Sequence, residues 1–178
     1  SIGHDALVHS FPGGELRMQI FSGKEGQLSR QKAIFDHVLQ GSPNREELEE
    51  LDRFINNTSI RVRLLYGGRV IDLPGDACGA DWADQSAKCD VMKLPHHGHR
   101  DSLTPKLLSE LSPEYAVISV SNDRADDCPS EKILTMLSDV NCKVLFTDAV
   151  QSRFSKQGFH ESVSFLIDST GNIRSSAE

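Results

Sequence analysis

Two short polar segments of this 178-residue chain combine residue types that can bind a metal ion or transfer a proton. The first holds Asp76, directly after a glycine at the end of an apolar run. A carboxylate placed there can approach one cation closely or bridge two of them. The alternative is a turn in which the aspartate bonds its own backbone, and an isolated Gly-Asp pair favours that alternative.

The second segment carries three histidines within four positions: His96, His97 and His99. Core packing explains such a cluster poorly, because every buried ring needs a polar partner, whereas neutral imidazole is the commonest metal ligand in proteins. A solvated surface loop is the alternative. Ser102 follows the histidines without a G-x-S-x-G elbow, so serine catalysis has no support, and no glycine-rich phosphate loop occurs in the chain.

The elements that must position these segments alternate in type over the second part of the chain. A β-hairpin is predicted over residues 58–74, where apolar and charged residues alternate on both sides of Gly67 and Gly68. Further strands are expected at residues 89–95, 115–120, 142–147 and 162–168, with helices beginning at Thr104 and near Pro129. This order predicts an α/β fold with a mixed, partly antiparallel β-sheet and flanking helices.

One strand and two helices are expected before the hairpin. Residues 15–21 show the alternation of a half-buried strand, and a helix should run from Ser29 to Gly41. Asn44 and Glu47 have the spacing of a capping box for the next helix. The apolar side chains expected to be buried by the two helices are Ala33, Ile34, Phe35, Val38, Leu39, Leu48, Leu51 and Ile55. Arg61 and Arg63 are expected to face solvent, and Trp82 is expected to pack over the sheet edge.

Length and composition predict a single domain over residues 1–178. The formal net charge of -7 argues against a broad basic surface for nucleic acid or anionic lipid. No apolar run is long enough to span a membrane, and the four cysteines form no C-x-x-C pair. We therefore expect a soluble cytoplasmic protein with reduced thiols and no membrane partner.

Five segments follow one another in an order that resembles the C-terminal half of a metallo-β-lactamase-fold hydrolase, nearest to the competence-protein (ComEC) type of domain. They are residues 56–60, 73–77, 92–99, 115–120 and 144–148. The resemblance implies half or most of an αβ/βα sandwich with one or two ions, zinc or manganese, at its rim. It makes Asp76 a carboxylate shared between metals and His97 a terminal ligand. It places His96 near the leaving group, with His99 assisting.

The chain departs from this family in its first part. The H-x-H-x-D-H signature, which supplies most of the family's ligands, is absent, and His4 and His9 do not reproduce it. The resemblance therefore implies that the N-terminal part of the family fold is missing. A second chain, or that missing half, would have to complete the sandwich. A flexible terminus is the simpler interpretation of His4 and His9.

Two functional hypotheses follow. The first is a metal-dependent hydrolase that uses a metal-activated water on an ester or phosphodiester, with small molecules and nucleic acid as candidate substrates. The alternative is a non-catalytic fragment, or a degenerate domain with a structural or interaction role, because one Asp and one or two His make an incomplete metal site.

Overall fold

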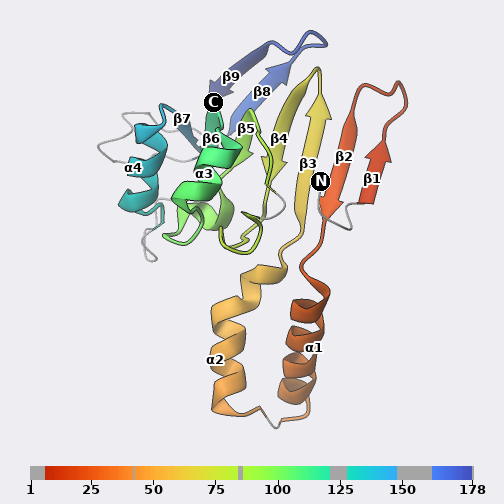
Figure 1. The fold of residues 1–178 in the computed structure, drawn as a ribbon, viewed down its shortest axis with the longest axis vertical. Coiled ribbons are helices and arrows are strands. Elements are labelled where there is room, and N and C mark those ends of the chain that lie inside the picture. The colour runs from red at the N-terminus through yellow and green to blue at the C-terminus, as the bar shows by residue number, and fades with distance from the viewer. Residues whose placement is uncertain (1–6, 42, 84–85, 121–127, 148–161, 178) are drawn as a thin grey trace.

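The computed structural model describes residues 7–41, 43–83, 86–120, 128–147 and 162–177. Seven strands form one mixed sheet in chain order, antiparallel from the first strand to the fourth and parallel from the fourth to the seventh (Figure 1). This confirms the predicted α/β class. The strands are β1 (Leu7–Ser10), β2 (Arg17–Phe21), β3 (Arg61–Tyr66), β4 (Arg69–Leu73), β5 (Val91–Lys93), β6 (Tyr115–Ile118) and β7 (Lys143–Phe146).

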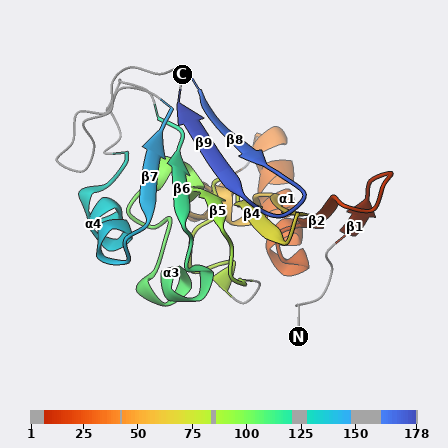
Figure 2. The same cartoon turned by 90° about the horizontal axis from the view of Figure 1, so that it is seen from above.

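The parallel part of the sheet is covered on both faces. Helices α3 (Pro105–Leu111) and α4 (Glu131–Asp139) lie on one face, and the hairpin of β8 (Val163–Ile167) and β9 (Ile173–Ala177) crosses the other (Figure 2). The ring of Tyr115 meets that of Phe165 at a centroid distance of 5.4 Å, which ties the hairpin to β6. A parallel sheet buried in this way accounts for the apolar runs of its strands.

The main apolar core lies between strands β5 to β7 and the two helices that cover them. It includes Met92, Ile118 and Phe146 from the sheet, and Leu107, Leu111, Ile133 and Leu137 from the helices. Helix α3 begins where the sequence predicted, because the Thr104 side chain accepts a hydrogen bond of 3.1 Å from the Leu107 backbone N–H. The core therefore holds the strand ends that carry the polar loops.

Helices α1 (Glu25–Leu39) and α2 (Arg45–Phe54), with the short 3₁₀ helix η1 (Ile55–Thr58), extend away from the sheet as a helical arm (Figure 1). The predicted capping box is confirmed: Asn44 and Glu47 exchange hydrogen bonds of 2.8 and 3.2 Å. The predicted buried faces were mostly wrong, since only Ile34 of the expected set is buried. Exposed members include Leu39, Leu48 and Ile55.

The two arginines of β3 are buried, so the prediction that they face solvent was wrong. The guanidinium of Arg61 lies 4.4 Å from the Trp82 ring centroid and 5.0 Å from that of Phe21. Arg63 pairs with the buried carboxylate of Asp72 on β4. Cation–π contacts and an ion pair compensate these two charges, which the alternation of residue types could not reveal.

Two strands were missed by the sequence analysis, β1 and β9. His9 lies in β1, where its ring contacts that of Phe11 at 4.9 Å, whereas His4 is outside the described residues. Within the described part of the chain, no helix has the length and apolar character needed to cross a membrane.

Candidate functional site

The two polar loops predicted to do chemistry, and a third segment with Ser119, follow three neighbouring parallel strands. Asp76 follows β4, the histidines follow β5, and Ser119 follows β6. Parallel strands end at the same edge of a sheet, so these segments meet there, which is where ligands of open α/β sheets commonly bind. A backbone hydrogen bond of 3.3 Å from His96 N–H to the Gly75 carbonyl joins the first two loops.

The histidine loop has an unusual backbone. His96 and His97 are consecutive non-glycine residues in the left-handed region, with φ of 47° and 55°. Such conformations cost about 1–2 kcal/mol each and occur frequently at functional sites. Gly98 follows with φ of 80°, and a Cβ atom there would lie 2.9 Å from the Cβ of Pro129. The loop therefore packs closely against the segment that precedes α4.

Asp76 and His97 meet at the strand ends. Asp76 Oδ1 lies 3.9 Å from His97 Nε2 and 3.6 Å from the ammonium of Lys93. His97 Nδ1 lies 2.6 Å from the carbonyl oxygen of Ser119, to which it must donate, because a carbonyl can only accept. The structure thus brings together the two residues that the resemblance implied as ligands. Their role as ligands stays a prediction.

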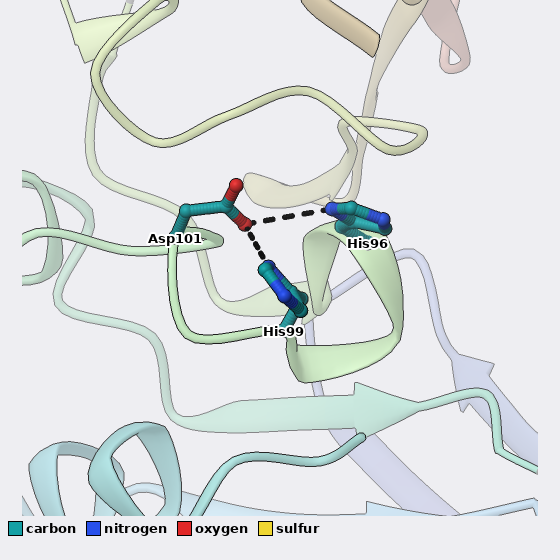
Figure 3. Close-up of side chains that lie close together, drawn as sticks. All are labelled: His96, His99 and Asp101. Atoms are coloured by element: carbon teal, nitrogen blue, oxygen red, sulfur yellow. Dashed lines mark hydrogen bonds and ion pairs between the residues drawn. The ribbon is translucent and has the colours of Figure 1, made fainter. Parts of the chain in front are cut away.

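His96 and His99 meet at a residue that the sequence analysis did not single out, Asp101 (Figure 3). Asp101 Oδ1 lies 2.7 Å from His99 Nδ1 and 3.4 Å from His96 Nδ1. The two rings lie 4.8 Å apart, and Asn56 Nδ2 of the arm lies 3.3 Å from His96 Nε2. The H-x-x-H-x-D spacing was the available signal for Asp101. The catalytic role predicted for His96 and His99 is not tested by these contacts.

Asp101 is held as a carboxylate by its neighbours. Burial alone would raise its pKa, but hydrogen bonds from Cys78 and His99 and the charges of the histidines lower the pKa below its usual value. The Cys78 thiol lies 3.0 Å from Asp101 Oδ2, and burial together with this carboxylate raises the thiol pKa to about 12. Cys78 is therefore a neutral donor that occupies one carboxylate oxygen and leaves the other facing the imidazoles.

His9 does not join this site through its strand. It belongs to β1 at the opposite edge of the antiparallel part, with β2 and β3 between β1 and β4. His4 lies outside the described residues, so its predicted role is not addressed.

Comparison with known proteins finds a competence-related relative. The chain is similar to ComE operon protein 3 of Bacillus subtilis (strain 168). The two are 28% identical over 142 residues, which covers 75% of this chain and 18% of ComE operon protein 3. The chain therefore spans less than a fifth of that relative. No family model matches the chain. These findings support a competence-related relative.

Proposed function

We propose that this chain carries part of the metal site of a metallo-β-lactamase-type hydrolase that cleaves an ester or phosphodiester with a metal-activated water. The likeness to ComE operon protein 3 and the order of the sequence segments support the relationship. The site at the ends of β4 and β5 supports the chemistry. Phosphodiesters are the leading substrate class, and nucleic acid would have to be bound locally, given the net charge of -7.

The observation that carries the proposal is the way His97 faces Asp76. With Nδ1–H donated to the Ser119 carbonyl, a neutral His97 has its lone pair on Nε2, 3.9 Å from a carboxylate oxygen. Two acceptors that face each other in this way can both bind one cation. Histidine ligands of metals commonly donate the other ring N–H to a carbonyl, as His97 does here.

Asp76 and His97 are suitable ligand types for zinc or manganese, but two ligands are too few for a catalytic site. One imidazole and one carboxylate are suitable ligands, but catalytic zinc sites typically have three protein ligands. The proposal therefore includes further ligands from outside the described residues or from a second copy of this chain. Asp76 and His97 are 40% and 49% exposed, so both are accessible to such a partner.

A metal bound there would act as a Lewis acid and lower the pKa of a bound water towards neutrality. The residues of this chain supply the positioning. The Ser119 carbonyl keeps the His97 ring in one tautomer and orientation, and the left-handed turn at Gly75, with φ of 62°, brings Asp76 to the same edge. Lys93 adds positive charge beside Asp76, which favours an anionic substrate.

A non-catalytic domain is the second candidate, and Lys93 also favours it. Its ammonium lies 3.6 Å from Asp76 Oδ1 and can neutralise the carboxylate without any metal. In that case Asp76, Lys93 and His97 form a polar cluster that stabilises the loops and binds no ion.

Metal binding and turnover distinguish the two candidates. Chelator-treated protein is titrated with Zn²⁺ and Mn²⁺ in a calorimeter, and hydrolysis of bis(p-nitrophenyl) phosphate is followed with and without chelator. We expect chelator-sensitive turnover that Asp76→Asn lowers at least about a hundredfold, because the metal contributes several kcal/mol to the transition state. The matched control is Asp139→Asn on the exposed face of α4, which should match the unaltered protein. Turnover that is absent or insensitive to both chelator and Asp76→Asn contradicts the proposal.

A further inference from the structure

Three side chains with metal-ligating atoms converge within one loop of six consecutive residues, beside the Asp76–His97 pair. They are His96, His99 and Asp101, and one ligand atom from each lies within 4.8 Å of the other two (Figure 3). Their side chains are 30%, 27% and 41% exposed, so the cluster lies at the surface of the protein. Because one short segment supplies all three, their proximity requires little chain-closure entropy.

The spacing of the atoms suits a small divalent cation. Ligand bonds of about 2.0–2.1 Å in a tetrahedral arrangement place neighbouring ligand atoms about 3.3 Å apart. The separation of His96 Nδ1 from Asp101 Oδ1 is 3.4 Å, and that of His99 Nδ1 from the same oxygen is 2.7 Å. The first separation already matches a shared cation, and the second is a hydrogen bond that a cation would replace with a small opening of the pair.

His96 Nδ1 is a buried polar atom whose bonding is incomplete. It lies 3.4 Å from Asp101 Oδ1, but it has no hydrogen-bond partner with acceptable geometry among the described residues. A buried nitrogen without a hydrogen bond is costly, and coordination of an ion would satisfy it. The left-handed backbone at His96, which turns this ring towards Asp101, is a local strain that binding energy can offset.

Cys78 and Asn56 contact these side chains in the way that residues around a metal site orient its ligands. The Cys78 thiol donates to Asp101 Oδ2 and leaves Oδ1 for the ion. Asn56 meets His96 Nε2 at 3.3 Å, and since the oxygen and nitrogen of an amide are interchangeable in assignment, Asn56 Oδ1 can accept Nε2–H when Nδ1 binds metal. Ligating histidines are commonly oriented by such a bond.

We propose that His96, His99 and Asp101 bind a divalent transition cation of the zinc class. Two imidazoles and one carboxylate suit zinc better than magnesium or calcium, and three protein ligands leave a coordination position open. The site does not depend on the proposed hydrolase function. It makes His96 and His99 ligands, in place of the direct role in the reaction that the sequence predicted.

Cobalt is the probe for this site, because Co²⁺ bound by imidazole absorbs visible light and Zn²⁺ displaces it. The chelator-treated full chain is titrated with CoCl₂, followed by ZnCl₂. We expect a cobalt band that His99→Ala and Asp101→Asn each abolish or weaken more than tenfold in affinity. Asn56→Ala should weaken cobalt binding about 10–100-fold, as loss of an outer partner does. The matched controls, His9→Ala and Asp139→Asn, alter exposed residues and should leave the band unchanged.

Asp76→Asn separates this site from the proposed active site. We expect this variant to lose hydrolysis and to keep the cobalt band of the loop. Circular dichroism without metal verifies that each variant is folded. Asn56 is only half-buried and lies at the arm, so Asn56→Ala keeps the test valid if Asp101→Asn misfolds. Cobalt affinity that is unchanged in both His99→Ala and Asn56→Ala overturns the inference, and so does a band that Asp76→Asn alone removes. In the unaltered protein, a cobalt band without any chelator-sensitive turnover supports this site and contradicts only the proposed function.

Discussion

At the scale of single residues, the sequence indicates which residue types can do chemistry, but it does not show which of them are in contact. Asp76 and the histidines stood out because each group follows an apolar strand, and the family resemblance paired Asp76 with His97. The structure brings these two to 3.9 Å. Asp101 was missed because a lone aspartate after an arginine resembles any solvated loop residue. Arg61 was assigned to solvent for the same reason, since only the folded chain places Trp82 against it.

The close packing of Gly98 gives a prediction at this scale. Gly98→Ala should lower the free energy of unfolding by clearly more than the cost of about 1–2 kcal/mol that a left-handed alanine carries. The added Cβ would lie 2.9 Å from Pro129, so the histidine loop must shift. Urea denaturation measures the loss.

Gly68→Ala is the matched control for that measurement. Gly68 has φ of 75°, close to the 80° of Gly98, but no atom lies within 4 Å of its added Cβ. Gly68→Ala should show the backbone cost alone. Equal losses in the two variants would mean that the loop is free to move away from Pro129.

At the scale of elements, the starts of α2 and α3 were predictable and the helix faces were not. The predicted start of α1 at Ser29 was wrong, because the helix begins at Glu25. The capping box of α2 depends on neighbours in the sequence, so Asn44 and Glu47 identified it correctly. Which face is buried depends on what packs against the helix. The arm is joined across its two helices by polar pairs such as Arg30 with Glu50, at 2.8 Å, and this leaves Leu39 and Leu48 exposed.

The arm should therefore open locally without unfolding of the sheet. Asn44→Ala removes a cap worth about 1 kcal/mol and should speed amide hydrogen exchange about fivefold in α2 and its partner α1. Exchange in β5 to β7 should be unchanged. The comparison is Thr104→Ala, which removes the cap of the core helix α3 and should lower global stability. Faster exchange throughout the sheet in Asn44→Ala would contradict an independent arm.

At the scale of the whole molecule, the alternation of strands and helices was sufficient to predict a mixed sheet. The Gly67–Gly68 hairpin and the helices of the second half were correct because turn glycines, caps and apolar spacing agree there. β1 was missed because four exposed residues show no apolar face, and β9 because its sequence is mostly small and polar. Strand order and the position of the arm depend on long-range contacts that no local pattern contains.

The stability of the whole sheet should depend on the ion pair between β3 and β4. Asp72→Ala leaves Arg63 as an uncompensated buried charge and should lower the free energy of unfolding by about 3–5 kcal/mol. Urea denaturation of the full chain tests this.

An exposed pair of the same type provides the control. Glu49→Gln breaks the pair of Glu49 with Arg45, 2.7 Å apart and largely exposed, and should change stability by less than about 1 kcal/mol. A loss of this small size in Asp72→Ala would show that water reaches Arg63 in the folded protein.

At strand β4 the sheet changes from antiparallel to parallel pairing. The strand is hydrogen-bonded to the antiparallel β3 on one side and to the parallel β5 on the other. A one-residue slip of this strand would break both ladders simultaneously and turn every side chain of β4 to the opposite face. The position of the carboxylate that follows β4 is consequently fixed by the pairing of β4 with β3 and by its pairing with β5. If the pairing of β4 with one neighbour is disturbed, the pairing with the other neighbour still holds Asp76 in place.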